Sequence, residues 1–389
     1  MAPIRTAVIG YGLSAKIFHI PFILSLPSVY TLHGIVQRNP TESNSAATAF
    51  PDAVIYKSTD EMLADNDVDL VIITTIPSTH YALVKQTLDA GKHVLCEKPF
   101  VPTAKEAYEL ESYAQEKGKK LCVYQNRRWD ADFVSLRSLL ADNTLGRVVE
   151  CESHFDRHRP AAPKVEAATW KAQESVANGA IYDLGTHLLD QLYTLFGLPE
   201  GVTAFVGNQR VYGPGTAGAD AGTGDSFTVH LHYPKQGLLA TAKAGVVSPE
   251  REQLRFWVRG EAGSFRKNNL DSQEDQLKLG LRPTGYVGPT GEVHSLAGKL
   301  EASEQYGVED SQYNGKVTSV KAGTVDAIEE RVLAPVSPPK TYVEIYRLLA
   351  NAIQGGAEVP VPAQQSGDVL RIIEAAIESS QQGKTVKLQ

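Results

Sequence analysis

Short apolar runs alternate with segments of helical period through the first third of the chain. The runs are apolar throughout, which is typical of parallel strands that are covered on both faces. Six strands are expected: Ile4 to Ile9, Thr31 to Val36, Val54 to Tyr56, Asp69 to Thr74, His93 to Leu95 and Lys120 to Tyr124. Because helices separate these strands, we predict right-handed crossovers and a doubly wound parallel sheet over residues 1–125.

The pattern changes after Arg128. Predicted helices are followed by closely spaced strands that are joined by Gly-rich turns, which is typical of antiparallel hairpins. The elements expected here are helices at Asp130 to Ala141, Asn178 to Phe196, Tyr342 to Ile353 and Gln365 to Glu378, and strands at Arg147 to Phe155, Val202 to Val211, Asp225 to Tyr233, Leu238 to Val246 and Gln253 to Arg259. The stretch from Gly280 to Lys340 is rich in Gly, Pro and Ser and shows no clear pattern. We predict an α+β domain over residues 126–389, built on a large open, mainly antiparallel sheet.

Composition narrows the class of protein. The chain has 389 residues, 42% apolar and 21% charged, which suits two globular domains and excludes a fibrous or disordered chain. The net charge is −7 and no basic stripe gathers, so nucleic acid is not an expected partner. The cysteines Cys96, Cys122 and Cys151 lie far apart, which predicts neither disulfides nor a metal site. No run approaches about eighteen apolar residues, and the first strand begins close to Met1, so we expect a cytoplasmic protein without a membrane partner.

A glycine-rich turn follows the first strand. Gly10-Tyr11-Gly12-Leu13-Ser14-Ala15 fits the G-x-G-x-x-G/A fingerprint of a Rossmann domain. Gly10 permits the tight turn, Gly12 lets the backbone approach a pyrophosphate, and Leu13 continues into the helix whose first NH groups face the phosphates. A glycine pair alone also occurs in turns that only need positive φ. Its place at the start of a strand–helix series favours dinucleotide binding.

The end of the second strand indicates which dinucleotide. An NAD enzyme usually carries an acid there to bind the ribose hydroxyls. This chain has Gln37 and then Arg38, whose guanidinium suits a 2′-phosphate, so NADP is predicted over NAD. The alternative is that Arg38 is an ordinary solvated loop residue.

Two further motifs carry candidate chemistry. Lys98, in Glu97-Lys98-Pro99, follows the fifth strand at the edge where open α/β sheets bind ligands. On the expected helix 178–196, Asp183, His187 and Asp190 fall on one polar stripe, and a histidine flanked by carboxylates suits acid/base catalysis. A structural histidine bonded within its own helix is the competing interpretation.

Taken together, these motifs resemble the glucose-fructose oxidoreductase / inositol dehydrogenase / MocA (Gfo/Idh/MocA) family over nearly the whole chain. The resemblance is carried by the glycine loop, residues 74–80 (TTIPSTH), residues 90–99 (AGKHVLCEKP) and the segment from Asp183 to His187. Residues 124–130 (YQNRRWD) and 157–160 (RHRP) look most like the NADP-dependent scyllo-inositol dehydrogenases of this family.

The resemblance implies roles for individual residues. Lys98 would meet the substrate hydroxyl, Asp183 would position it and His187 would be the acid/base. Glu97 would lie near the nicotinamide ribose. Lys98 is also expected to contact the cofactor. The remaining expected contacts are Thr74, Thr75, Pro77 and His80 for the cofactor, and Arg127, Arg157 and Arg159 for the substrate.

The sequence therefore predicts an NADP-dependent oxidoreductase that transfers hydride between the nicotinamide and a secondary alcohol or ketone of a polyol, inositol or sugar. The alternatives are a non-catalytic dinucleotide- or sugar-sensing regulator of the same fold, or an enzyme acting on an aldose, a trans-dihydrodiol or an imine. An exposed sheet face and the resemblance together predict a homodimer or a dimer of dimers.

Overall fold

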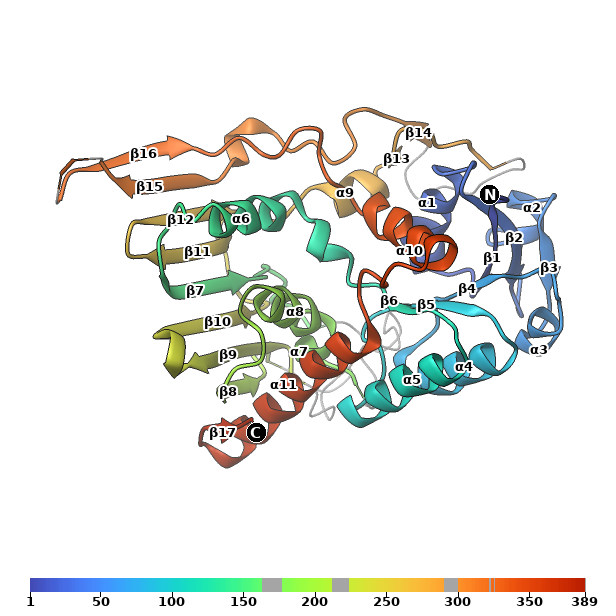
Figure 1. Ribbon diagram of the computed structural model, residues 1–389, viewed down its shortest axis with the longest axis horizontal. Coiled ribbons are helices and arrows are strands. Elements are labelled where there is room, and N and C mark those ends of the chain that lie inside the picture. The colour runs from blue at the N-terminus through green and yellow to red at the C-terminus, as the bar shows by residue number, and fades with distance from the viewer. Residues whose placement is uncertain (163–176, 212–223, 290–299, 322, 325, 389) are drawn as a thin grey trace.

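A parallel six-stranded sheet forms the N-terminal part of the computed structural model, which describes residues 1–162, 177–211, 224–289, 300–321, 323–324, 326–388 (Figure 1). The strand order β3-β2-β1-β4-β5-β6 is that of a doubly wound nucleotide-binding sheet, as predicted. The strands are β1 (Ile4–Ile9), β2 (Tyr30–Val36), β3 (Val54–Tyr56), β4 (Leu70–Ile73), β5 (His93–Cys96) and β6 (Leu121–Val123). Helices between them are α1 (Ile20–Leu24), α2 (Ala46–Ala49), α3 (Thr59–Leu63), α4 (Pro77–Asp89) and α5 (Ala104–Glu116). Strand β4 is buried at every position, which explains its wholly apolar sequence.

The helix after the glycine loop is irregular, which the sequence pattern did not predict. It begins as a π-helical turn, Ala15–His19, and continues as the short α1. Pro21 lies in the first turn of α1 and has no NH to offer the carbonyl of the preceding turn, so a regular α-helix cannot run through it.

A second, larger sheet fills the rest of the molecule. Its order over the described residues is β16-β15-β12-β11-β7-β10-β9-β8-β17, and only β7 and β10 pair in parallel, which confirms the predicted mainly antiparallel sheet. The strands are β7 (Val148–His154), β8 (Gly201–Gly207), β9 (Ser226–Tyr233), β10 (Leu238–Ala244), β11 (Leu254–Gly260), β12 (Gly263–Asn268), β15 (Lys316–Val320), β16 (Ile328–Val332) and β17 (Val386–Lys387). A separate two-stranded ladder joins β13 (Leu281–Arg282) to β14 (Glu301–Ala302).

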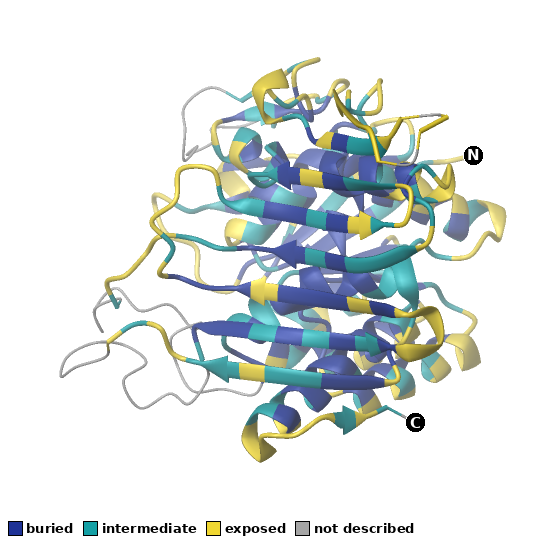
Figure 2. Ribbon diagram, turned by 90° about the vertical axis from the view of Figure 1, so that its left-hand side faces the viewer, coloured by how far each residue is buried: buried dark blue, intermediate teal, exposed yellow. Residues whose placement is uncertain are grey.

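Helices cover one face of the large sheet and leave the other open, as Figure 2 shows. The helices of this part are α6 (Ala131–Ala141), α7 (Ala180–Asp183), α8 (Gly185–Phe196), α9 (Gln273–Lys278), α10 (Val343–Gly355) and α11 (Ala363–Gln382). Strands β15 and β16 and helix α9 were missed, because β15 and β16 lie in the stretch without a clear pattern and α9 is only 6 residues long. The helix predicted over 178–196 is divided into α7 and α8 at Leu184.

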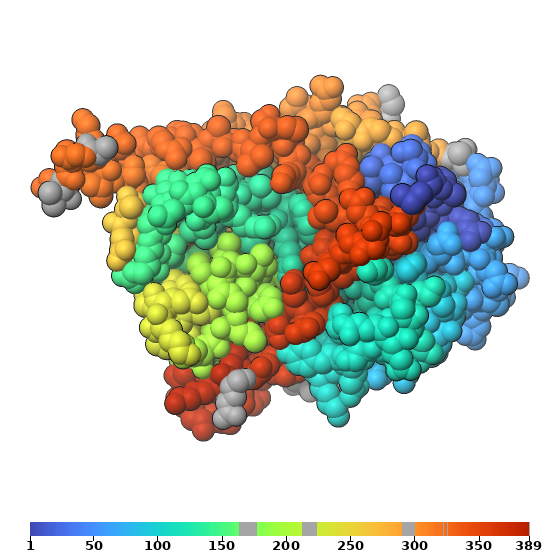
Figure 3. All heavy atoms as spheres, viewed as in Figure 1, coloured from blue at the N-terminus to red at the C-terminus, as the bar shows by residue number. Residues whose placement is uncertain are grey.

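The C-terminal helices connect the two sheets. Helix α11 packs on α5 and on β8, and α10 lies against α1, so the red end of the chain crosses from one part of the molecule to the other (Figure 3). The hydroxyl of the buried Tyr346 on α10 lies 2.7 Å from Nδ1 of His19. The boundary placed between residues 125 and 126 stays a prediction. None of the helices in the described part of the chain combines the length and the apolar composition that a membrane span requires.

Candidate active site

A cavity of about 570 Å³ lies where the carboxyl ends of β1, β4 and β5 meet β7, α7, α8 and α9. Residues from the two sheets line it together. The lining residues are Gly12, Leu13, Ser14, Phe18, Thr74, Thr75, Ile76, Pro77, Glu97, Lys98, Pro99, Tyr124, Asn126, Arg127, Phe155, Arg157, Arg159, Asp183, Leu184, His187, Glu274 and Lys278. All of the predicted substrate contacts are among them.

The glycine loop has the shape that a pyrophosphate needs. Gly10 has a φ of +99°, and a Cβ there would come within 2.9 Å of the Thr74 hydroxyl. A Cβ on Gly12 would meet nothing within 4 Å, so the backbone is open toward the cavity. The neighbouring Leu13 is 54% exposed and leaves this approach uncovered. The loop therefore fits a bound dinucleotide.

Four predicted cofactor contacts, Gly10, Gln37, Arg38 and His80, are not among the residues that line the cavity. The Gln37 amide donates to the Asn44 carbonyl at 2.7 Å, and its Oε1 accepts from the Ala46 NH at 2.7 Å, so this side chain shapes the loop after β2. His80 is fully buried, with carbonyl oxygens of Phe100 at 2.8 Å and Thr75 at 3.1 Å from its two ring nitrogens. Both side chains hold neighbouring segments in place. Arg38 is exposed just beyond β2.

Thr74, Thr75 and Pro77 form the wall next to the glycine loop, as predicted from the resemblance. The Thr74 hydroxyl donates to the Ile9 carbonyl at 2.8 Å, which ties β4 to the turn after β1. The Thr75 and Thr79 hydroxyls lie 2.7 Å apart at the start of α4, and Pro77 occupies the first turn of that helix. Proline suits this position because the first helical NH has no partner in the helix.

Glu97 is the centre of a buried network under the cavity. Its carboxylate accepts hydrogen bonds from the Ser14 hydroxyl, from His19 Nε2 at 3.0 Å and from the Lys98 backbone NH at 2.9 Å. Burial acts to raise the pKa of Glu97, but the bonds from His19 and Ser14 and the charge of Lys98 outweigh it and lower this pKa to about 2. Glu97 is therefore ionised and joins the glycine loop to the lysine turn. Sequence reasoning missed His19, which occupies a position of helical period without a motif of its own.

Lys98 and Asp183 meet across the two parts of the molecule. Lys98 Nζ lies 3.1 Å from Asp183 Oδ1 and 3.2 Å from its backbone carbonyl. Their side chains are 18% and 29% exposed, so the pair can reach both the cavity and water. The Lys98–Pro99 peptide bond is cis.

His187 lines the same cavity from the first turn of α8 and is buried. The predicted polar stripe does not extend to Asp190. That carboxylate accepts two hydrogen bonds from Arg128, at 2.8 and 2.6 Å, in the core between α8 and the segment before α6. The break at Leu184 separates Asp183 from α8, so the single-helix geometry of the prediction was wrong, although Asp183 and His187 still reach one cavity.

Three arginines, Arg127, Arg157 and Arg159, also line the cavity. Arg127 donates one hydrogen bond to Glu274 on α9 and another, of 3.3 Å, to Asp130. Its guanidinium lies 4.9 Å from the centre of the Phe155 ring. Burial acts to raise the pKa of Glu274, but the charge of Arg127 and a hydrogen bond from Lys278 lower it to about 2. No sequence motif pointed to Glu274 or Lys278, because α9 lies far along the chain from the other site residues.

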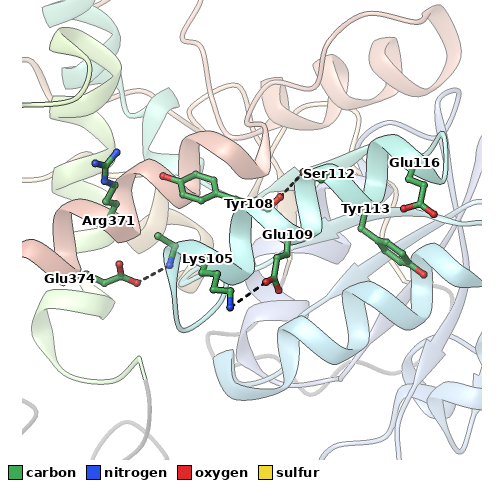
Figure 4. Close-up of a pocket in the computed structure, with 9 residues that line it drawn as sticks. Lys105, Tyr108, Glu109, Ser112, Tyr113, Glu116, Arg371 and Glu374 are labelled. Atoms are coloured by element: carbon green, nitrogen blue, oxygen red, sulfur yellow. Dashed lines mark hydrogen bonds and ion pairs between the residues drawn. The ribbon is translucent and has the colours of Figure 1, made fainter. Parts of the chain in front are cut away.

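A second hollow of about 650 Å³ lies between α5 and α11 (Figure 4). Its side chains bond to their neighbours: Glu374 accepts from the Ala104 NH at 2.8 Å, and Lys105 lies 3.8 Å from Glu109. None of the predicted site residues lines it. Within the described residues, no group of three or more His, Cys, Asp or Glu side chains is placed to hold a metal ion.

A Rossmann sheet whose glycine loop opens on a lysine, a carboxylate and a histidine is typical of a dinucleotide-dependent oxidoreductase. Comparison with known proteins gives the family. Residues 4–125 match the model of the oxidoreductase family with an NAD-binding Rossmann fold, and residues 133–266 match the GFO/IDH/MocA C-terminal domain. The chain belongs to the Gfo/Idh/MocA oxidoreductase family.

Relatives of full length agree with this assignment. An uncharacterised oxidoreductase of Schizosaccharomyces pombe, C115.03, is 35% identical over 100% of both chains. The scyllo-inositol 2-dehydrogenase (NADP(+)) IolW of Bacillus subtilis is 33% identical over 99% of this chain and 96% of its own. The crystal structure of an oxidoreductase from Bacillus cereus has a TM-score of 0.81 and 29% identity, and covers 99% of each chain.

Proposed function

We propose that the protein is an NADP-dependent dehydrogenase that interconverts a secondary alcohol and a ketone in a polyol, an inositol or a sugar. The observation that carries the proposal is the contact of Lys98 with Asp183 in the cavity that also holds His187 and the glycine loop. The similarity to a scyllo-inositol 2-dehydrogenase (NADP(+)) supports the substrate class and the cofactor.

Each residue has a distinct task in this proposal. His187 accepts the proton of the substrate hydroxyl, and Lys98 Nζ stabilises the negative charge that develops on the oxygen. Asp183 holds Lys98 Nζ at 3.1 Å and so keeps it on that oxygen. When bound, the nicotinamide supplies the hydride acceptor. The walls of the cavity remove water from the reacting groups, which strengthens these electrostatic contacts.

The test is a substrate screen. We expect NADP reduction at 340 nm with at least one inositol, polyol or sugar, and NADPH oxidation with the matching ketone or lactone. Aldoses and trans-dihydrodiols belong in the same panel, because they would identify an enzyme of another substrate class. Tight NADP binding without turnover of any compound in either direction would contradict the proposal and favour a regulator that senses the dinucleotide.

Cofactor preference is a separate expectation. No carboxylate closes β2, because Gln37 stands there with its amide bonded to the loop, and Arg38 is exposed beside it. We expect kcat/KM to favour NADP over NAD by at least about tenfold, or about 1.4 kcal/mol. Arg38→Ala should lower NADP use more than NAD use, whereas Arg137→Ala on the exposed side of α6 should change neither. Equal use of both cofactors by the unmodified enzyme would refute this expectation.

The open face of the large sheet supports a homodimer or a dimer of dimers. Large apolar side chains are exposed on it near both edges of the sheet: Phe205 (70%) on β8, and Ile328 (72%) and Val332 (61%) on β16. Leu239 on β10 lies on the same face and is 37% exposed. Apolar side chains exposed on an open sheet face are often covered by a partner in an assembly. We expect light scattering to give at least twice the mass of the 389-residue chain at micromolar concentration, and Phe205→Asp to weaken the assembly. A monomer at that concentration would overturn this expectation.

A further inference from the structure

The charges that line the active-site cavity do not balance. Five cationic side chains and three carboxylates line it: Lys98, Arg127, Arg157, Arg159 and Lys278 against Glu97, Asp183 and Glu274. This excess of positive charge stands in a chain whose net charge is −7. The cavity should therefore attract anions although the protein as a whole repels them.

Three of the five cations already have acidic partners. Lys98 pairs with Asp183, and Arg127 and Lys278 both pair with Glu274. For Arg157 and Arg159, no carboxylate of the described residues lies within 4 Å of the guanidinium. Arg157 instead stacks on the Phe155 ring, 4.5 Å from its centre. These two arginines are the cations available to a ligand.

The chain segment that carries the pair is held firmly. The Arg157 NH donates to the Gly245 carbonyl at 2.9 Å, and the Arg159 NH donates to the Val246 carbonyl at 2.8 Å. Between them, His158 forms an antiparallel bridge with Val247. In extended backbone, side chains two positions apart point to the same side, and both arginines line the cavity. The backbone at both arginines is thus held in place, and both side chains line the cavity.

The acids near Arg157 do not fully compensate for its burial. Burial, and then the like charge of Arg159, lower the pKa of Arg157. A half-buried cation beside another cation normally requires a compensating negative charge. A carboxylate or phosphate would supply it, because each offers two oxygens to the planar donors of an arginine.

We propose that Arg157 and Arg159 bind an anionic substituent of the substrate, a carboxylate or a phosphate, so that the enzyme prefers an acidic sugar or polyol to a neutral one. The inference rests on the proposed dehydrogenase function, since it concerns the substrate of that site. Two carboxylates of the cavity, Asp183 and then Glu274, act to raise the pKa of Arg157. The anionic group therefore lies on the Lys98 and Asp183 side of the cavity, whereas the glycine loop and Arg38 serve the phosphates of the dinucleotide.

The experiment measures binding apart from turnover. Protein saturated with NADPH, which cannot accept hydride, is titrated by calorimetry with D-glucose, D-gluconate, D-glucuronate, D-glucose 6-phosphate, myo-inositol and inorganic phosphate. We expect at least one carboxylate or phosphate compound to bind about tenfold or more tightly than its neutral counterpart. Arg157→Gln should remove that preference, Arg157→Lys should retain part of it, and Arg137→Gln should leave it unchanged. The carboxylates and the phosphates form two arms that identify which anion is preferred.

Several results would overturn the inference. Equal affinity for acidic and neutral compounds would do so, as would the lack of any anion binding that depends on Arg157. An Arg157→Gln variant that loses NADPH affinity but not acid preference would assign the pair to the cofactor instead. NADP reduction with neutral sugars alone would support the proposed dehydrogenase but contradict the preference for an anionic substrate. Binding of an acid that depends on Arg157, with no turnover of any compound, would support the anion site and count against the dehydrogenase.

Discussion

Replacing Lys98 or His187 by alanine should lower kcat by about 10² to 10⁴, because proton transfer by a positioned side chain is worth about that factor. Hydride leaves carbon readily only while the hydroxyl proton is leaving, so a base and a positive charge must serve the same oxygen. Neither side chain is expected to hold the phosphates of the cofactor. We therefore expect the Kd for NADP, measured by fluorescence titration, to stay nearly constant in both variants.

The two residues should also act as one unit. The variant that lacks both side chains should lose much less than the product of the two single losses, since groups that serve one step are not additive. Asp183→Asn should lower kcat less than either alanine variant does and should also raise KM, because Asp183 orients Lys98 from across the cavity. Full kcat in His187→Ala would assign the base to another group, and Lys98 would be the next candidate.

Local signals in the sequence located much of this site. The glycine loop and the lysine turn each follow a strand directly, and the topology of a parallel sheet brings such turns to one edge. Their positions could therefore be predicted once the strands were recognised. The same holds for Thr74 and Pro77, which stand between β4 and α4 at that edge.

Contacts between distant segments could not be predicted in this way. Glu274 reaches Arg127 from 147 residues along the chain, and Tyr346 reaches His19 from 327 residues away. Neither pairing produces a periodic pattern in the sequence, because the paired residues come close only through the packing of α9 and α10. The arginine pair of the cavity was predicted through a resemblance, but the structure was needed to show that no carboxylate of the described residues pairs with it.

Asp190 illustrates how a sequence pattern can be physically sound and yet misassign a residue. Spacing alone put it on the stripe of His187, whereas the structure directs its carboxylate to Arg128. The two side chains are 2% and 7% exposed, so the pair is buried. Burial acts to lower the pKa of Arg128, but the charge and hydrogen bonds of Asp190 raise it. Asp190 therefore stabilises the fold rather than the transition state.

Asp190→Ala should accordingly destabilise the protein by about 3–5 kcal/mol, because it leaves the Arg128 cation buried without its carboxylate. Among the described residues, the side-chain hydrogen bond left to Arg128 is the one from Nη1 to Gln365, at 2.7 Å, which does not neutralise the charge. The double variant Asp190→Leu with Arg128→Met should recover much of that loss, since it removes both buried charges and refills their volume. Urea titrations followed by circular dichroism give the free energies of unfolding.

The pH dependence of kcat/KM distinguishes a structural role of Asp190 from a role in acid/base catalysis. If Asp190 is structural, the folded fraction of Asp190→Asn keeps the pH profile of the unmodified enzyme. A shifted profile at unchanged stability would instead assign Asp190 to acid/base catalysis together with His187.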